Sequence, residues 1–174
     1  YTVTNGLPPR FVLLLLPPII LISSLFFTKK GMRFINSLDV KTLTLLHTVR
    51  ILVELTLYGL YLHKAAPKIM TFEGSNFDIL CGLTAPFVYY FGYIKNILSR
   101  RVLITWNIIC LLLLANIVVI AILSAPLSFQ QFAFDDPNIA VLYFPFVWLP
   151  CCIVPIVLLA HLAAINNLLR LHKS

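Results

Sequence analysis

Charged residues are scarce in this sequence. Only 11% of the 174 residues are charged and 60% are hydrophobic, whereas a soluble domain usually has about 25% charged residues. A water-soluble fold cannot hide so much apolar surface, and the mean hydropathy of +0.97 comes from several separate apolar runs. The composition therefore excludes a soluble globular domain and predicts an all-α protein, a polytopic transmembrane helical bundle.

Known catalytic and metal-binding motifs are also absent. There is no HExxH, GxSxG, Walker or dinucleotide-binding pattern. The four cysteines lie in apolar runs without CxxC spacing, at Cys81, Cys110, Cys151 and Cys152, which is typical of small buried hydrophobic residues. The sequence thus names no cofactor and no catalytic residue, and it leaves open whether the chain is an enzyme.

Five apolar runs are near the roughly 17 to 25 residues that cross a bilayer as a helix. They cover residues 11–27, 43–62, 79–94, 102–123 and 139–165. We expect them to form about five helices of a single domain over residues 1–174. The distribution of basic residues described next places the N-terminus outside the membrane. Because an outside N-terminus must be carried across the membrane, we also expect a sixth helix or a cleaved signal before Tyr1.

Acidic residues are fewer than basic ones, and the basic residues are unevenly placed. Six Asp and Glu stand against 13 Lys and Arg, for a net charge of +7. Three segments are basic: between runs one and two (Lys29, Lys30, Arg33, Lys41), between three and four (Lys95, Arg100, Arg101), and after five (Arg170, Lys173). The other connectors hold Lys64 and Lys68 with Glu73 and Asp78, and then Asp135 and Asp136. By the positive-inside rule, the N-terminus is outside and the C-terminus is cytoplasmic.

A strongly basic soluble protein would suggest a nucleic-acid partner. Here the basic clusters lie between apolar runs, where they set orientation and contact anionic lipid head groups. We therefore expect membrane lipids as partners and no nucleic acid. A second copy of the chain or a partner membrane protein is an additional candidate.

Polar residues repeat along the second apolar run. His47, Arg50, Glu54, Tyr58 and Tyr61 follow one another at spacings of three, four, four and three, which places all of them on one helical face. Glu54 lies about 16 Å along the helix from Leu43 at about 1.5 Å per residue. A charge at such a depth costs on the order of 2.5 to 3.5 kcal/mol, so this face must point into the bundle.

Two interpretations of this polar face stay open. In the structural one, Arg50 and Glu54 form an i,i+4 pair and neutralise each other. In the functional one, the five residues bind a lipid-like or small apolar ligand, or a partner helix. Alternatives are an intramembrane enzyme on a lipid or isoprenoid substrate, with Glu54 or His47 as acid or base and Arg50 holding an anion, and a small proton-coupled transporter with Glu54 titrating.

Prolines and histidines in the fifth run add two further expectations. Pro145, Pro150 and Pro155 each remove a backbone donor, which predicts an interrupted helix beside the polar face and a cavity between the second, third and fifth helices. His161 and His47 are expected at similar depths, where two histidines could hold a haem or a metal. Only these two candidate ligands are expected at that depth, and His47 is already near Arg50 and Glu54, so we expect no metal, with His47 and His161 as weak candidates.

Three segments resemble a known group of proteins. They are LHTVR at 46–50, MTFEGSNFDIL at 70–80 and QQFAFDDPNIAVLYFPFVWLP at 130–150. These segments resemble a family of uncharacterised small multi-pass bacterial inner-membrane proteins. The resemblance covers most of the chain and implies a location in a bacterial inner membrane and a further N-terminal hydrophobic segment. It brings no activity.

Overall fold

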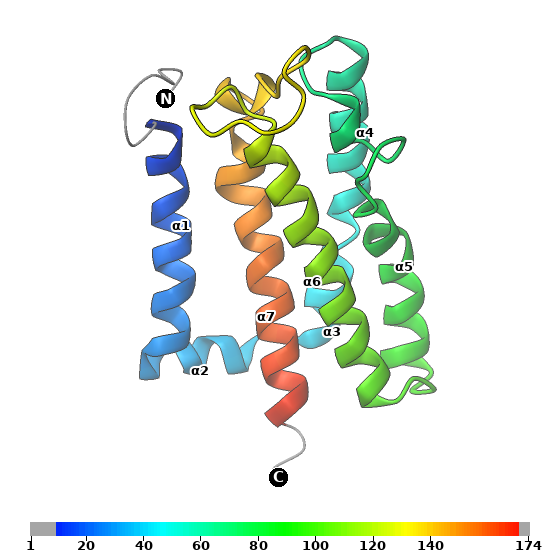
Figure 1. Ribbon diagram of the computed structural model, residues 1–174. Coiled ribbons are helices and arrows are strands. Elements are labelled where there is room, and N and C mark those ends of the chain that lie inside the picture. The colour runs from blue at the N-terminus through cyan, green and yellow to red at the C-terminus, as the bar shows by residue number, and fades with distance from the viewer. Residues whose placement is uncertain (1–9, 171–174) are drawn as a thin grey trace.

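The computed structural model describes the backbone of residues 10–170, and all regular structure in that range is helical (Figure 1). The elements are α1 (Arg10–Phe27), α2 (Lys29–Ser37), α3 (Val40–Leu46), α4 (Val49–Leu62), the 3₁₀ turn η1 (Lys68–Met70), α5 (Ile79–Tyr89), the π-helical turn η2 (Tyr90–Ile94), α6 (Arg100–Leu123), the 3₁₀ turn η3 (Ala140–Leu142), the π-helical turn η4 (Leu149–Ile153) and α7 (Val154–Arg170). The expected all-helical bundle is confirmed.

Three helical stretches are long and apolar enough to cross a membrane. They are residues 40–62 (α3 with α4), 100–123 (α6) and 149–170 (η4 with α7). Helices α1 and α2 would form a fourth crossing only as a pair that bends by 92°. The stretch formed by α5 and η2, Ile79–Ile94, is apolar but shorter. By length and composition, three of the five expected spans are therefore long enough on their own.

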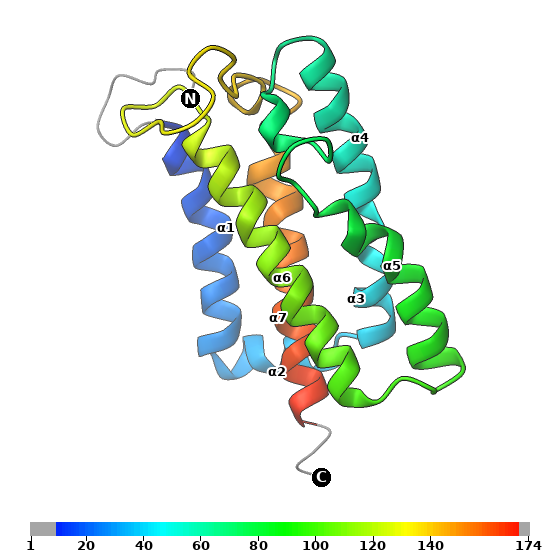
Figure 2. The same cartoon turned by 45° about the vertical axis from the view of Figure 1, so that its right-hand side comes forward.

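Helices α6 and α7 pack against each other in the middle of the bundle (Figures 1 and 2). Helix α3 packs on α7, and α5 packs on both α3 and α4. Helices α3, α4 and α5 therefore lie on one side of the bundle. Helix α1 lies on the other side, against α7 and η4. The connector between α5 and α6 and the C-terminal end of α7 lie at one end of the bundle, which we call the basic end, together with α2. The long connectors 63–78 and 124–148 reach the opposite end.

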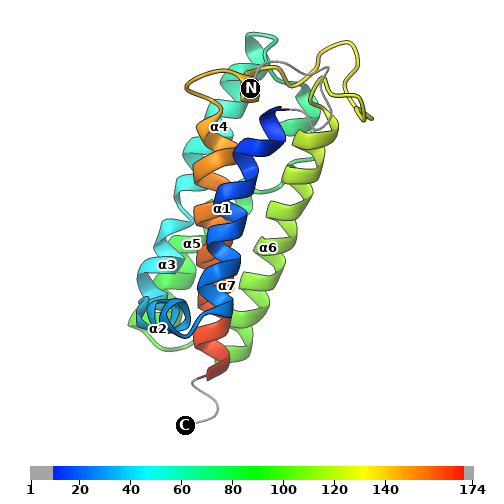
Figure 3. The same cartoon turned by 90° about the vertical axis from the view of Figure 1, so that its left-hand side faces the viewer.

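Helix α2 was not among the predicted helices. It lies across the basic end and is seen nearly end-on in Figure 3. Thr28 caps its N-terminus, because the Thr28 Oγ1 accepts a hydrogen bond from the Gly31 amide at 3.1 Å. Gly31 and Ile35 are buried, whereas its three basic residues, Lys29, Lys30 and Arg33, are exposed. A short amphipathic helix of this kind suits the surface of a membrane and not its interior.

The last helix begins later than the sequence suggested. Its first turn is η4 at Leu149 instead of Ile139, and the helix continues to Arg170 instead of Ile165. Pro145 therefore precedes the helix, and Pro150 and Pro155 are the second residues of η4 and α7. Proline is tolerated in a first helical turn, where the missing amide would have no intrahelical partner. Pro145 and Pro150 thus shape the start of the helix and do not interrupt its middle.

Helices α4 and α5 approach each other closely at Gly82. A Cβ atom added at Gly82 would lie 2.9 Å from Ile51 Cγ1 and 3.1 Å from the Ile51 amide nitrogen. Such distances are below normal van der Waals contact, so any other residue at position 82 would require the atoms of Ile51 or the two helices to shift. The approach brings the start of α5 directly beside Arg50 on α4.

Candidate functional site

The polar face begins at a tightened turn between α3 and α4. The amides of His47, Thr48 and Arg50 bond to carbonyls three residues earlier, at 3.3, 3.0 and 3.1 Å. This 3₁₀ pattern places side chains at i and i+3 above one another. Because His47 and Arg50 are separated by three residues, both point to the same side of the span. Short 3₁₀ stretches within a long helix often mark a functional or strained site.

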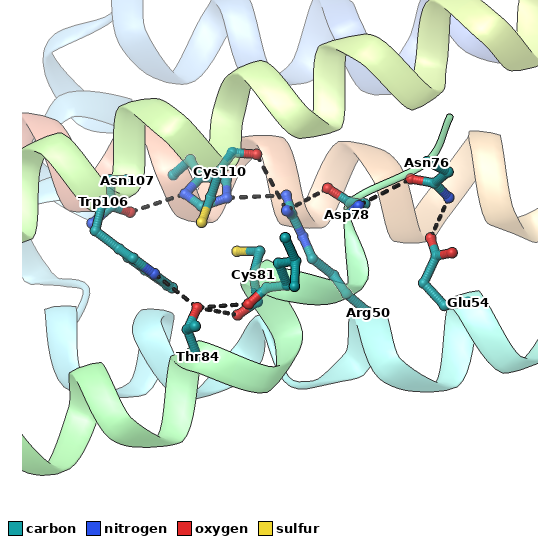
Figure 4. A network of polar contacts seen from close by, with 11 residues as sticks. Arg50, Glu54, Asn76, Asp78, Cys81, Thr84, Trp106, Asn107 and Cys110 are labelled. Carbon is teal, nitrogen blue, oxygen red and sulfur yellow. Dashed lines mark hydrogen bonds and ion pairs between the residues drawn. The ribbon is translucent and has the colours of Figure 1, made fainter. Parts of the chain in front are cut away.

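Arg50 is the centre of a buried polar network (Figure 4). Its Nη1 donates to Asp78 Oδ1 at 2.7 Å and to the Cys110 carbonyl oxygen at 3.2 Å. Its Nη2 lies 3.0 Å from His161 Nε2. Arg50 is 2% exposed and Asp78 is 3% exposed. The ion pair is therefore shielded from solvent, and the Arg50 network joins α4 to the N-terminal cap of α5, to α6 and to α7.

This pairing corrects two expectations. The sequence predicted Asp78 in a connector outside the membrane, and the structural interpretation of the polar face paired Arg50 with Glu54. In the structure, the connector before α5 folds back into the bundle, and the Asp78 carboxylate reaches the guanidinium from a different element. Only the three-dimensional path of the chain brings these residues together, so helix periodicity could not reveal it.

Glu54 belongs to the same network through Asn76. Glu54 is 1% exposed, and its Oε1 accepts a hydrogen bond from Asn76 Nδ2 at 2.5 Å. The Asn76 amide group also donates to the Met70 carbonyl at 2.9 Å and accepts from the Asp78 amide at 3.0 Å. Asn76 thus bridges the Glu54 carboxyl and the residue that pairs with Arg50. The Glu54 Oε2 has no partner among the described residues.

The hydrogen-bond network fixes the tautomer of His161. The Asn107 Nδ2 donates to the Leu103 carbonyl at 2.9 Å, which turns its Oδ1 toward His161 Nδ1 at 2.9 Å. The Nδ1 therefore carries a hydrogen, and Nε2 accepts from the Arg50 guanidinium. A second proton on this ring would face a cation, so His161 is neutral here.

His47 and His161 lie face to face. Their ring centroids are 3.8 Å apart and the planes differ by 13°, while Trp106 packs against His47 edge-on at 5.7 Å. Rings in face contact leave no space between them for a haem or an ion. Both ring nitrogens of His47 lack a partner among the described residues, although His47 is 0% exposed.

Tyr58 and Tyr61 continue the polar face but leave the buried network. Both are partly exposed. The Tyr58 hydroxyl donates to Glu73 Oε1 at 3.2 Å, and its ring packs on Phe72 at 4.9 Å. The structure therefore buries His47, Arg50 and Glu54 together and places the two tyrosines toward the end of α4 that lies away from the basic end.

A pocket of about 460 Å³ lies at the basic end, where α2, α3, η2 and α7 meet. Its polar lining is Asn36, Asp39, Lys41, Tyr93, Asn167 and Arg170. Its apolar lining is Leu38, Val40 and Leu168. None of the five residues of the polar face lines this pocket, which is therefore a different place from the cavity expected beside Glu54. The Thr44 Oγ1 donates to the Tyr93 hydroxyl at 3.4 Å, which connects the pocket wall to α3.

The charged groups of the pocket differ in how they are held. Burial opposes ionisation of Asp39, but bonds from the Thr42 hydroxyl and amide and from the Lys41 amide outweigh it and lower the pKa of Asp39. The hydroxyl bond is 2.9 Å and the Thr42 amide bond 3.1 Å. Lys41 and Arg170 are exposed and form no ion pair within residues 10–170. Their cationic groups are available to an anion.

Sequence reasoning missed several members of the buried network. They are Asn76, Asp78, Cys81, Trp106, Asn107 and Cys110. Asn107 gave a usable signal, because it is an amide inside the apolar run 102–123. Asp78 gave none, since its position beside Glu73 in a connector looks like an exposed loop. A polar residue within a long apolar run was the only available clue.

Fold and site together define an all-helical bundle with three helices long enough to cross a membrane and a buried arginine, aspartate and histidine network inside it. A family model described as "Domain of unknown function (DUF8737)" matches residues 8–169. The chain belongs to this family, whose description assigns no activity. Comparison with curated proteins and with solved structures gave no match.

Proposed function

We propose that this chain is an integral membrane protein that binds an anionic, hydroxyl-bearing phospholipid in the pocket at its basic end. The observation that carries the proposal is the pocket itself. It is about 460 Å³ in volume and places Lys41 and Arg170 beside the apolar side chains Leu38 and Val40. Binding pockets of this size are common for small amphipathic ligands.

The position of the pocket supports a lipid as the ligand. Three apolar helices of membrane-crossing length run away from the basic end. Helix α2 lies across that end with Lys29, Lys30 and Arg33 exposed. Basic residues of this kind attract anionic head groups at a membrane surface, and the positive-inside rule makes this end cytoplasmic. The pocket would then face the cytoplasmic leaflet.

The charges of the lining favour a particular head group. Lys41 and Arg170 contribute two positive charges and Asp39 one negative charge, so the lining has a net charge of +1. A phosphate diester fits the two cations. The Asp39 carboxylate would repel a second phosphate but can accept hydrogen bonds from hydroxyl groups, as can the Asn36 carbonyl. A phosphodiester with a glycerol or similar polyol head group satisfies both.

The buried network supports the rival functions less well. Transfer of a proton from Glu54 to His161 would pass Arg50, and a guanidinium does not release its proton in proteins. The Arg50 charge is also neutralised by Asp78, so it is not available to hold a substrate anion. Among the described residues, the pocket lining includes neither Glu54 nor His47. We therefore assign the network a role in fixing the bundle.

Native mass spectrometry of the protein from mixed nanodiscs tests this proposal. The lipid would be phosphatidylglycerol and phosphatidylcholine in equal amounts. We expect retained phosphatidylglycerol in the parent and loss of this preference in Lys41→Gln, Arg170→Gln. The matched control Lys64→Gln, Lys68→Gln removes the same charge from the opposite end and should keep the preference. Equal retention in both double variants, or no preference in the parent, contradicts the proposal.

A further inference from the structure

A cluster of metal-ligating side chains lies inside the bundle and has no part in the proposed lipid site. The ligand atoms of His47, Cys81 and His161 all lie within 4.8 Å of one another, and all three residues are buried. They come from the α3–α4 junction, α5 and α7. Figure 4 shows Cys81 and Cys110 beside the Arg50 network.

The second observation is the state of the His47 ring. His47 is 0% exposed, and neither ring nitrogen has a hydrogen-bond partner in the described part of the chain. Buried polar atoms in native proteins nearly always have a partner, so two unpaired nitrogens on one ring point to an ion or ligand. The free thiol of Cys81, also 0% exposed, is the sulfur donor of this cluster.

Ring geometry decides which histidine binds. A metal lies close to the plane of a ligating imidazole, so two stacked rings cannot both bind one ion as they stand. His161 is held at Nδ1 by Asn107 and at Nε2 by Arg50. His47 has no such bonds, so a change in its ring orientation toward Cys81 would break no hydrogen bond among the described residues. The geometry points to a two-ligand site made by the His47 imidazole and the Cys81 thiolate, in which the His161 ring only packs against His47.

The charge of the surroundings selects the ion. Arg50 and Asp78 already form a neutral pair at 2.7 Å. One thiolate and a monovalent cation leave the charge of the interior unchanged, whereas one thiolate and a divalent cation would add a positive charge to it. Thiolate and imidazole donors favour Cu(I) among monovalent metal ions. We propose that His47 and Cys81 bind one Cu(I) ion; the Cys81 thiol proton leaves to the solvent as the copper–sulfur bond forms, and no oxidation state changes.

Anaerobic titration of the purified full chain in detergent with Cu(I), against a chromophoric Cu(I) chelator, tests this site. We expect one equivalent to bind to the parent. Cys81→Ala and His47→Gln should each weaken binding by at least tenfold. The matched control is Cys152→Ala, because Cys152 is exposed and lies outside the cluster. Unchanged affinity in Cys81→Ala, or equal loss in Cys152→Ala, overturns the proposal.

Two measurements on the parent keep the test decisive if a variant does not fold. The X-ray absorption spectrum of the Cu(I) protein should show a mixed sulfur and nitrogen shell, and a shell of nitrogen and oxygen alone would contradict the site. Competition with Zn(II) should leave Cu(I) bound. Displacement of Cu(I) by equimolar Zn(II) would contradict the charge argument. Loss of lipid preference in the pocket variants would leave this result unaffected, because the two sites share no residue.

Discussion

The Arg50 guanidinium and the Asp78 carboxylate lie 2.7 Å apart in the interior of the bundle, although 28 residues separate them in the chain. The pair ties α4 to the connector that precedes α5. Through its second nitrogen, Arg50 also reaches His161 on α7. With its bond to the Cys110 carbonyl on α6, this one side chain joins four parts of the chain that the sequence separates widely.

We expect removal of either partner of this pair to be costly. Arg50→Met or Asp78→Asn leaves a buried charge without its counter-ion, and such changes lower the free energy of unfolding by about 3–5 kcal/mol. The double variant should lose less than the sum of the two single losses, because it leaves neither charge unpaired. Unfolding in detergent, followed by circular dichroism, measures all three.

The matched control for this cycle is Glu54→Gln. Glu54 bonds to Asn76 and not to Arg50, so the coupling free energy between Arg50 and Glu54 should be smaller than that between Arg50 and Asp78. Equal coupling in the two cycles would show that the i,i+4 pair contributes as much as the pair seen in the structure.

Two glycines should respond to alanine in opposite directions. At Gly82 the new Cβ would lie 2.9 Å from Ile51 Cγ1, so Gly82→Ala should force α5 away from α4 and destabilise by about 1–3 kcal/mol. At Gly59 no atom lies within 4 Å of the new Cβ, so Gly59→Ala should stabilise α4 by up to about 1 kcal/mol. Thermal unfolding of both variants checks this, and a stabilised Gly82→Ala variant would mean that the two helices are not closely packed.

Asp39 should make a pH-dependent contribution as the N-cap of α3. Asp39→Ala removes the acceptor for the Lys41 and Thr42 amides and should cost about 1 kcal/mol. Because the pKa of Asp39 is lowered in the folded chain, this stabilisation is complete above the ordinary aspartate pKa and is lost as the pH falls through the lowered value.

The comparison variant is Ser99→Ala at the start of α6, where the Ser99 hydroxyl accepts from the Val102 amide at 3.4 Å. Its cost should not change with pH, since serine does not titrate. An Asp39→Ala cost that stays constant from neutral to strongly acidic pH would contradict the assigned cap.

The orientation in the membrane is tested by cysteine labelling. Ser75 lies in the connector before α5 and Ser99 at the basic end, and both are exposed. In a background with Cys151→Ala and Cys152→Ala, we expect Ser75→Cys to react with a membrane-impermeant maleimide added to intact cells. Ser99→Cys should react only after permeabilisation. The reverse pattern would place the basic end outside.

The long helices could be predicted from the sequence because an apolar run of about 20 residues has the length of a helix that crosses a bilayer. Helix α2 could not, since its exposed Lys29, Lys30 and Arg33 look like a charged connector and its apolar side is narrow. The sequence also predicted the start of the last helix too early, at residue 139 instead of Leu149. The run 139–148 is apolar, but it packs as a 3₁₀ turn and a loop before η4.

The polar face was only partly predictable, for a different reason. Helical spacing correctly places His47, Arg50 and Glu54 on the inner side of the span, where all three are buried. It cannot supply their partners, because Asp78, Asn76 and Asn107 reach them through tertiary folding. The pocket is formed by the ends of four elements, and no local pattern in the sequence marks it.

Photocrosslinking at the pocket wall tests the central claim most directly. Benzoyl-phenylalanine would replace Tyr93, which lines the pocket, and in a control Tyr90, which is exposed on the same turn of η2. In membranes of mixed lipids, we expect the probe at position 93 to crosslink phosphatidylglycerol well above its share of the bilayer. The probe at position 90 should crosslink lipids in their bulk proportions. Bulk proportions at both positions would contradict a lipid site in this pocket.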